Sequence, residues 1–111
     1  MREREVDVVV IGAGPVGENL AQYATEDSGL TAVLIEQELV GGECSYYACV
    51  PSKILLRPLE VAALAADQPG LTAPGVDTAA VLANRDVWVS HYDDSGQVAW
   101  AESAGIDVVR G

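Results

Sequence analysis

Cys44 and Cys49 are the residues of this chain whose type best suits covalent chemistry. They lie five positions apart, in a segment that opens with Gly41-Gly42 and closes with Pro51-Ser52-Lys53. The chain shows no export signal, so the functional options for two cysteines are metal binding or redox chemistry rather than a secreted disulfide framework. A metal site needs more ligands, and the single histidine, His91, lies far along the chain, so we expect no metal site.

A glycine motif near the start of the chain supplies a second group of candidate residues. Residues 12–17 read Gly-Ala-Gly-Pro-Val-Gly and fit Gly-x-Gly-x-x-Gly. The first glycine permits a tight turn, the second lets the backbone approach a pyrophosphate, and the third lets helix and strand pack closely. A carboxylate at the end of a later apolar run can accept hydrogen bonds from both hydroxyls of a ribose and would repel a 2′-phosphate. The predicted dinucleotide-binding residues are Gly12, Gly14, Pro15, Gly17 and Glu36.

The elements that position these residues can be predicted from the apolar pattern. Residues 6–11 form a β-branched run typical of a strand buried on both faces of a parallel sheet. Residues 15–25 carry apolar side chains at helical spacing, with Gly29 as a stop, and residues 31–36 are again strand-like. This order predicts a βαβ unit with a right-handed crossover. In that context the glycine motif indicates dinucleotide binding, whereas alone it would equally suit a tight turn in an ordinary α/β protein.

The remainder of the chain is predicted to be mostly helical. A helix carries both cysteines and continues to about residue 66, with kinks expected at Pro51 and Pro58 because proline removes a helical hydrogen bond. A loop rich in proline and glycine follows at residues 68–75.

Beyond that loop, Asp77 is a suitable N-cap for a further helix that runs to about residue 103, with residues 93–96 as the place where it would be interrupted. Gly105 ends this helix, and residues 106–109 form a third strand.

The cysteine segment resembles the active-site segment of the flavoprotein disulfide reductases, the family of dihydrolipoamide dehydrogenase, glutathione reductase and mercuric reductase. Residues 41–53 read Gly-Gly-Glu-Cys-Ser-Tyr-Tyr-Ala-Cys-Val-Pro-Ser-Lys, against a family pattern of Gly-Gly-Thr-Cys-x-Asn-x-Gly-Cys-x-Pro-Ser-Lys. The glycine motif precedes this segment as it does in the family, so the resemblance covers essentially the whole chain. Departures from the pattern occur at Glu43, Tyr46 and Ala48.

The resemblance implies an FAD-dependent oxidoreductase that passes electrons between NAD or NADP and a small-molecule acceptor through a Cys44–Cys49 redox disulfide. Cys49 would be the charge-transfer thiol beside the flavin, and Cys44 the interchange thiol that attacks substrate. Gly42, Glu43 and Lys53 join the cofactor-binding residues. A regular helix would place residues five apart about 7.5 Å from each other along its axis, so such a disulfide requires a distorted backbone.

The resemblance also implies how this chain relates to a complete enzyme. Family members are several times longer, so we expect residues 1–111 to be an N-terminal part of the FAD-binding domain, an incomplete α/β Rossmann-like unit. The nicotinamide domain, the interface domain and a His-Glu acid-base pair donated by the partner subunit of a homodimer would lie beyond it. The acceptor could be lipoamide, a glutathione-like disulfide, mercuric ion or a quinone.

Charge and hydropathy exclude several other classes of function. The formal net charge of −11, from 17 acidic and 6 basic residues, disfavours binding to nucleic acid or to an anionic membrane. No stretch approaches the roughly 18 continuous apolar residues of a membrane helix, and Asp7 interrupts the run that could mimic a signal peptide. The expected location is the cytoplasm.

Two alternatives of other classes remain at this stage. One is a flavin-binding or structural chain without catalysis, which would keep the glycine motif and show no turnover. The other is an NAD-binding Rossmann domain with incidental structural cysteines, which would be colourless and indifferent to thiol reagents.

Overall fold

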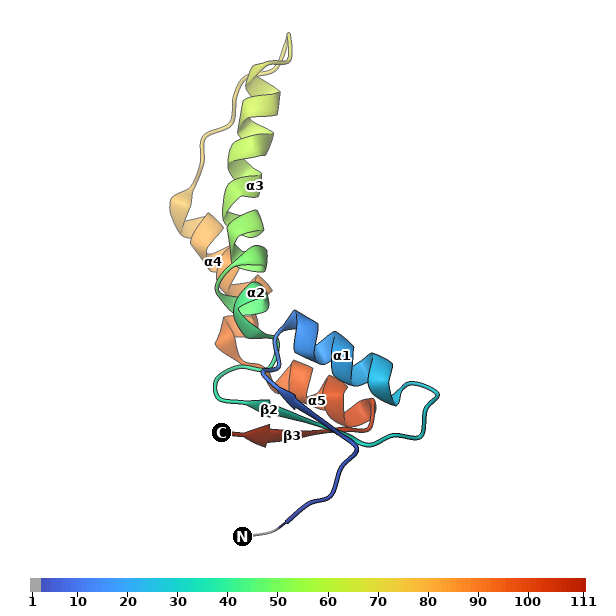
Figure 1. The fold of residues 1–111 in the computed structure, drawn as a ribbon. Coiled ribbons are helices and arrows are strands. Elements are labelled where there is room, and N and C mark those ends of the chain that lie inside the picture. Colours follow the sequence, from blue (N-terminus) through green and yellow to red (C-terminus); the bar gives the residue numbers. More distant parts are fainter. Residues whose placement is uncertain (1–2) are drawn as a thin grey trace.

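The computed structural model describes residues 3–111, whose three strands form one parallel sheet (Figure 1). The strands are β1 (Val8–Ile11), β2 (Ala32–Glu36) and β3 (Ile106–Arg110), in the spatial order β1-β2-β3. Val8 lies opposite Ala32, and Ala32 lies opposite Ile106. The predicted α/β Rossmann-like fold with a parallel sheet is confirmed.

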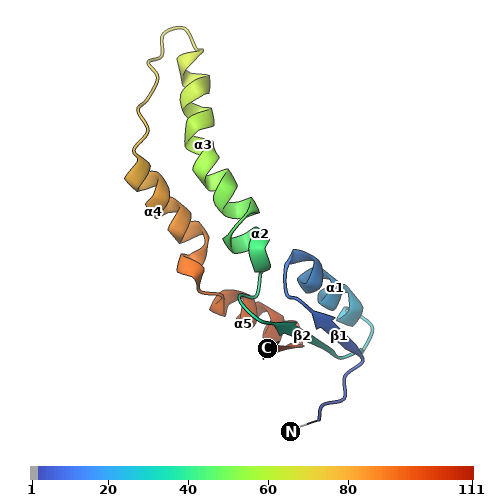
Figure 2. The same cartoon turned by 60° about the vertical axis from the view of Figure 1, so that its left-hand side comes forward.

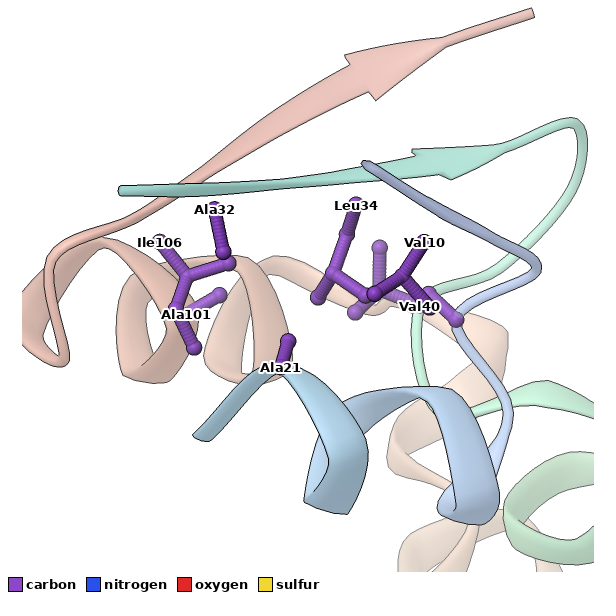
Figure 3. Packing of buried hydrophobic residues seen from close by; sticks show 8 residues of the cluster. Val10, Ala21, Ala32, Leu34, Val40, Ala101 and Ile106 are labelled. Carbon is purple, nitrogen blue, oxygen red and sulfur yellow. The ribbon is translucent and has the colours of Figure 1, made fainter. Parts of the chain in front are cut away.

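Two helices cover one face of this sheet. Helix α1 (Pro15–Thr25) joins β1 to β2, and helix α5 (Ser95–Ser103) leads directly into β3. The core lies between these helices and the strands, as Figure 3 shows, and its buried side chains are Val10, Ala13, Ala21, Ala32, Leu34, Val40, Ala101 and Ile106. On the opposite face the side chains of Val9 and Ile11 are exposed. The expectation that the first strand is buried on both faces is therefore wrong, because β1 is packed on one face only. In the central strand β2, by contrast, Val33 and Leu34 are both buried, so this strand is covered on both faces.

The remaining helices extend away from the sheet. Helices α2 (Gly42–Tyr46) and α3 (Cys49–Ala66) follow β2, and α4 (Thr78–Trp88) packs against α3 after the loop that joins them (Figure 2). Within residues 3–111, no helix combines the length and the apolar character needed to cross a membrane.

The cysteine segment forms two helices where the sequence predicted one. The break lies at Tyr47 and Ala48, and Ala48 has a φ of −126° and a ψ of −88°. The expected kink at Pro51 is wrong, because Pro51 falls in the first turn of α3, where a backbone N–H has no partner within the helix. The first N–H bonded within α3 is that of Ser52, which donates to the Ala48 carbonyl at 3.0 Å. Pro58 lies inside α3 as predicted.

The long helix expected after Asp77 is also two helices. Asp77 caps α4 as predicted, since its carboxylate accepts from the Ala80 amide at 3.1 Å. The helix ends at Trp88 rather than at residues 93–96, because a 3-10 turn η1 (Ser90–Tyr92) follows. All three residues of η1 have positive φ values, of 53°, 52° and 61°. A right-handed helix cannot pass through three left-handed residues, so a new helix has to start at Ser95.

Candidate functional site

The glycine turn between β1 and α1 has the shape needed to accept a phosphate group. Gly12 has a φ of 95°, and a Cβ added to Gly17 would collide with the carbonyl oxygen of Gly12, so the turn and the helix meet closely there. Gly14 is the N-cap of α1 and has open space where a side chain would stand. Among residues 3–111, no side chain caps α1, and Pro15 takes its first position. The helix therefore presents a partial positive charge and backbone N–H groups to an anion.

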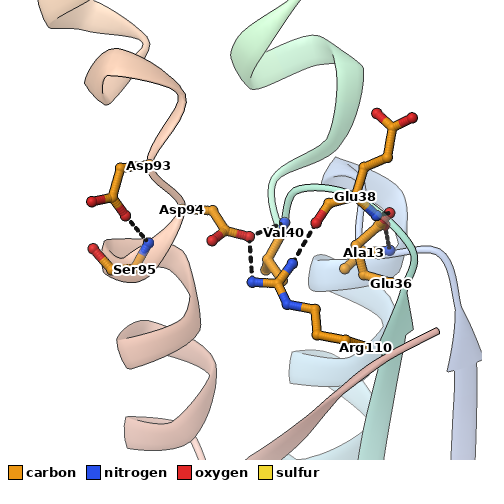
Figure 4. A network of polar contacts seen from close by, with 8 residues as sticks. All are labelled: Ala13, Glu36, Glu38, Val40, Asp93, Asp94, Ser95 and Arg110. Carbon is orange, nitrogen blue, oxygen red and sulfur yellow. Dashed lines mark hydrogen bonds and ion pairs between the residues drawn. The ribbon is translucent and has the colours of Figure 1, made fainter.

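Glu36 is held at the end of β2, beside this turn. One carboxylate oxygen accepts from the Ala13 amide at 2.8 Å and the other from the Glu38 amide at 2.8 Å (Figure 4). The loop that follows returns to the turn, because the Gly41 amide donates to the Ala13 carbonyl at 2.7 Å. Each carboxylate oxygen has further lone pairs, so the fixed carboxylate can still accept from ribose hydroxyls.

A cavity of about 260 Å³ brings the glycine turn, the acid and the start of α2 together. Its lining residues are Gly14, Glu36, Gln37, Glu38, Leu39, Gly42, Glu43 and Tyr47. Gly42 has a φ of 64°, and a Cβ added there would lie 2.6 Å from the Cα of Gly14. The close approach of α2 to the turn therefore requires glycine at this position. A second hollow, of about 300 Å³, lies against Gly12 and the other side of Glu36.

The structure thus groups Gly14, Glu36, Gly42 and Glu43 from the predicted cofactor-binding set around one cavity. Lys53 is exposed on α3 and does not line this cavity, so its role near a flavin stays a prediction. Residues 37–39 and Tyr47 were not predicted from the sequence. The only signal for them was their position between the acid, the glycine pair and the cysteines.

Cys44 and Cys49 form a disulfide with a Cα–Cα separation of 4.6 Å. Cys44 lies in α2 and Cys49 is the first residue of α3, so the break at Tyr47 and Ala48 is the distortion that the pairing requires. Cys44 is half-buried and Cys49 is exposed. Cys44 lies in the sequence between Glu43 and Tyr47, which both line the cavity, whereas neither cysteine lines it.

The two tyrosines between the cysteines occupy different environments. Tyr46 is 4% exposed and packs over Gly41, whose added Cβ would lie 2.9 Å from the Tyr46 ring. Burial, with smaller contributions from Asp94, Glu18 and Asp93, raises the pKa of Tyr46, so its phenol is neutral at physiological pH. Tyr47 instead faces the cavity and stacks on Tyr92, with ring centroids 5.6 Å apart.

Comparison with known proteins agrees with this arrangement. The family model described as pyridine nucleotide-disulphide oxidoreductase matches residues 6–108. The mercuric reductase of Staphylococcus aureus is 34% identical over 114 residues, an alignment that covers 99% of this chain and 21% of that protein. The dihydrolipoyl dehydrogenase of Bacillus subtilis is 42% identical over 74 residues, covering 65% of this chain and 15% of that protein.

Solved structures show the same fold. The Cu(II) complex of an HOCl-induced flavoprotein disulfide reductase from Escherichia coli superposes with a TM-score of 0.74 at 23% identity, covering 98% of this chain and 22% of that one. Nearly all of this chain aligns with these two proteins, but it spans only about a fifth of their length. Family members use FAD and NAD(P)H, in agreement with the expected cofactors. The chain belongs to the pyridine nucleotide-disulphide oxidoreductase family.

Proposed function

We propose that this chain is part of an FAD-dependent oxidoreductase. The enzyme passes electrons between a nicotinamide nucleotide and a disulfide-type or related acceptor through Cys44 and Cys49. One observation carries the proposal. Helix α2 has only five residues, of which Gly42 and Glu43 line the cavity of about 260 Å³ and the third is Cys44 of the disulfide. A redox-active bond and a candidate cofactor site are therefore adjoining parts of the same short element.

The residues around the cavity fit an adenine dinucleotide. The uncapped start of α1 and the open space at Gly14 suit a pyrophosphate, and the carboxylate of Glu36 suits a ribose with free 2′ and 3′ hydroxyls. Because Gly42 has no side chain, α2 can lie against the glycine turn and form one wall of the cavity. When bound, FAD supplies two-electron transfer between a nicotinamide and a disulfide.

The chain's own chemistry is the interconversion of the disulfide and two thiols. Reduction breaks the S–S bond and takes up two electrons and two protons. When the disulfide forms again, two electrons pass to the acceptor, and the two protons go to the thiols of a disulfide acceptor or, with mercuric ion, to solvent. In this proposal Cys44 attacks the acceptor, and Cys49, which is exposed at the start of α3, faces the flavin. Lys53 lies one turn beyond Cys49 on the same helix, where its positive charge can act on the cofactor.

We further propose that residues 1–111 form the N-terminal part of an FAD-binding domain. The chain's share of about a fifth of its relatives supports this. A nicotinamide domain, an interface domain and a homodimer partner that donates a His-Glu pair would complete a cytoplasmic enzyme. The relatives named mercuric reductase and dihydrolipoyl dehydrogenase favour mercuric ion or a lipoamide-type disulfide among the acceptors considered.

Two measurements on purified protein test the proposal. Extraction of bound ligand and the visible absorbance spectrum should reveal flavin, whereas recovery of NAD without flavin would favour an NAD-binding domain. Mass spectrometry should show a mass increase on alkylation only after reduction, because both thiols are paired. A Cys44→Ser variant is the matched control, since it leaves Cys49 open to alkylation without reduction. Two freely alkylated thiols in air-oxidised wild-type protein would contradict the redox role.

A further inference from the structure

Two side chains that are far from residues 37–41 in the sequence form hydrogen bonds to that loop, which is part of the cavity wall. Arg110, the last residue of β3, pairs with Asp94 at an N–O distance of 2.6 Å. The same guanidinium donates to the Glu38 carbonyl at 2.5 Å, and the Asp94 carboxylate accepts from the Val40 amide at 2.7 Å (Figure 4). A carbonyl and an amide of the loop at residues 37–41 are thus bound to one ion pair, which we call the Asp94–Arg110 clamp.

The surroundings of the clamp distinguish it from an ordinary surface ion pair. The Asp94 side chain is 12% exposed and Val40 is fully buried, while the Arg110 side chain is 46% exposed. In the pair between Arg4 and Asp107, by contrast, both side chains are about 60% exposed. Hydrogen bonds to a shielded charged group are stronger than those of solvated pairs, and removing Asp94 would leave the buried Val40 amide without its acceptor.

The loop held by the clamp also holds the carboxylate of the candidate nucleotide site. Gln37, Glu38 and Leu39 line the cavity, and the Glu38 amide donates to Glu36 at 2.8 Å. Movement of Glu38 therefore displaces a group that orients Glu36. At its other end the loop is bonded to the glycine turn through Gly41 and the Ala13 carbonyl.

We propose that Asp94 and Arg110 are positioning residues of the nucleotide site. They act through the loop at residues 37–41 and keep the Glu36 carboxylate where it meets the ribose hydroxyls. This inference rests on the proposed nucleotide binding. By linkage, a bound nucleotide stabilises the clamp to the same extent as the clamp stabilises binding, so ligand should slow hydrogen exchange of the Val40 amide.

The test compares affinities of the full chain for ADP and 2′-deoxy-ADP by calorimetry. The wild-type chain should prefer ADP, because Glu36 accepts from the 2′ hydroxyl. Asp94→Ala and Arg110→Met should each weaken ADP binding about tenfold and bring the ratio of the two affinities close to one. A mere loss of folded protein would lower both affinities by the same factor and leave the ratio unchanged.

Two further variants serve as controls. Asp94→Asn keeps an oxygen that can accept from both donors, so it should retain most of the ADP preference. Asp107→Asn removes the exposed ion pair on the same strand and should change neither affinity nor ratio. If Asp94→Ala and Arg110→Met keep the wild-type ratio, as Asp107→Asn does, the positioning role is wrong.

Hydrogen exchange separates this inference from the proposed function because it needs no ligand. Faster exchange of the Val40 and Gly41 amides in Asp94→Ala, with the Leu34 amide of the core unchanged, supports the clamp. Unchanged exchange at Val40 overturns the clamp even if ADP binds. A wild-type chain that binds neither nucleotide contradicts the proposed function, and the nucleotide role of the clamp with it.

Discussion

Replacing Gly42 by alanine should destabilise the fold and impair nucleotide binding together. Two effects add at this position. A residue with a Cβ pays about 1–2 kcal/mol to adopt the left-handed conformation that Gly42 has, with a φ of 64°. The new Cβ would also lie 2.6 Å from the Gly14 backbone, and relieving such an overlap costs about 1–3 kcal/mol. The expected loss is therefore about 2–5 kcal/mol, a large share of the roughly 5–15 kcal/mol that stabilises a typical domain.

Gly29→Ala is the matched control. Gly29 has a similar φ of 72°, but nothing lies within 4 Å of an added Cβ, so this variant carries the backbone cost alone. Urea denaturation of both variants isolates the overlap as the difference between their free energies of unfolding. Calorimetry with ADP should show weaker binding only in Gly42→Ala, because Gly42 and Gly14 both line the cavity. If Gly42→Ala loses no more stability than Gly29→Ala, the close contact between α2 and the glycine turn is not what requires glycine.

Two further predictions concern a buried acid and the isolated chain. Glu18 is 9% exposed, and one of its carboxylate oxygens has no hydrogen-bond partner among the described residues. Burial raises the pKa of this carboxyl above its ordinary 4.5. The stability that the protonated side chain contributes is therefore present below pH 4.5 and lost as the pH rises through the pKa of the folded state. Glu18→Gln should therefore be more stable than wild type at pH 7, with the gap in the free energy of unfolding closing near pH 4 in urea titrations. A gap that does not depend on pH contradicts this. The 111-residue chain alone should not turn over a disulfide with FAD and NADH or NADPH, because a helix N-terminus stabilises a thiolate by only about 0.3–1 kcal/mol and an external acid-base pair is needed. Steady-state turnover within tenfold of a longer family member would show that the chain is a complete enzyme.

Much of the candidate nucleotide site could be predicted from the sequence because its signals are local. The β-branched runs, the glycine spacing and the acid that ends β2 each depend on residues close together in the chain. The N-cap at Asp77 is equally local, since the carboxylate bonds an amide three positions away. These features follow from backbone sterics and short-range hydrogen bonding, which a sequence pattern expresses directly.

The two helix breaks could not be located from the pattern. Helical spacing of apolar residues continues across Tyr47-Ala48 and across residues 89–94, where no glycine marks the left-handed turn. In the first case the break accompanies a disulfide between neighbouring helices. In the second, the left-handed turn lets α5 start in a new direction and pack on the sheet.

The long-range contacts that support the cavity's loop were decided by tertiary structure alone. Arg110 meets Glu38 across 72 positions, and Asp94 meets Val40 across 54. The first contact exists because the parallel pairing of β2 with β3 places Arg110 opposite Glu36. The second exists because Asp94 immediately precedes α5, which packs beside β3. The sequence by itself predicted which residues would bind a nucleotide and exchange electrons, and the glycine spacing, the acid and the cysteine pair that carry this prediction are all local features. The packing of β3 and α5 beside β2 determined which distant charges hold that loop in place, since the apolar pattern of each segment predicts its own structure but not which segments become neighbours.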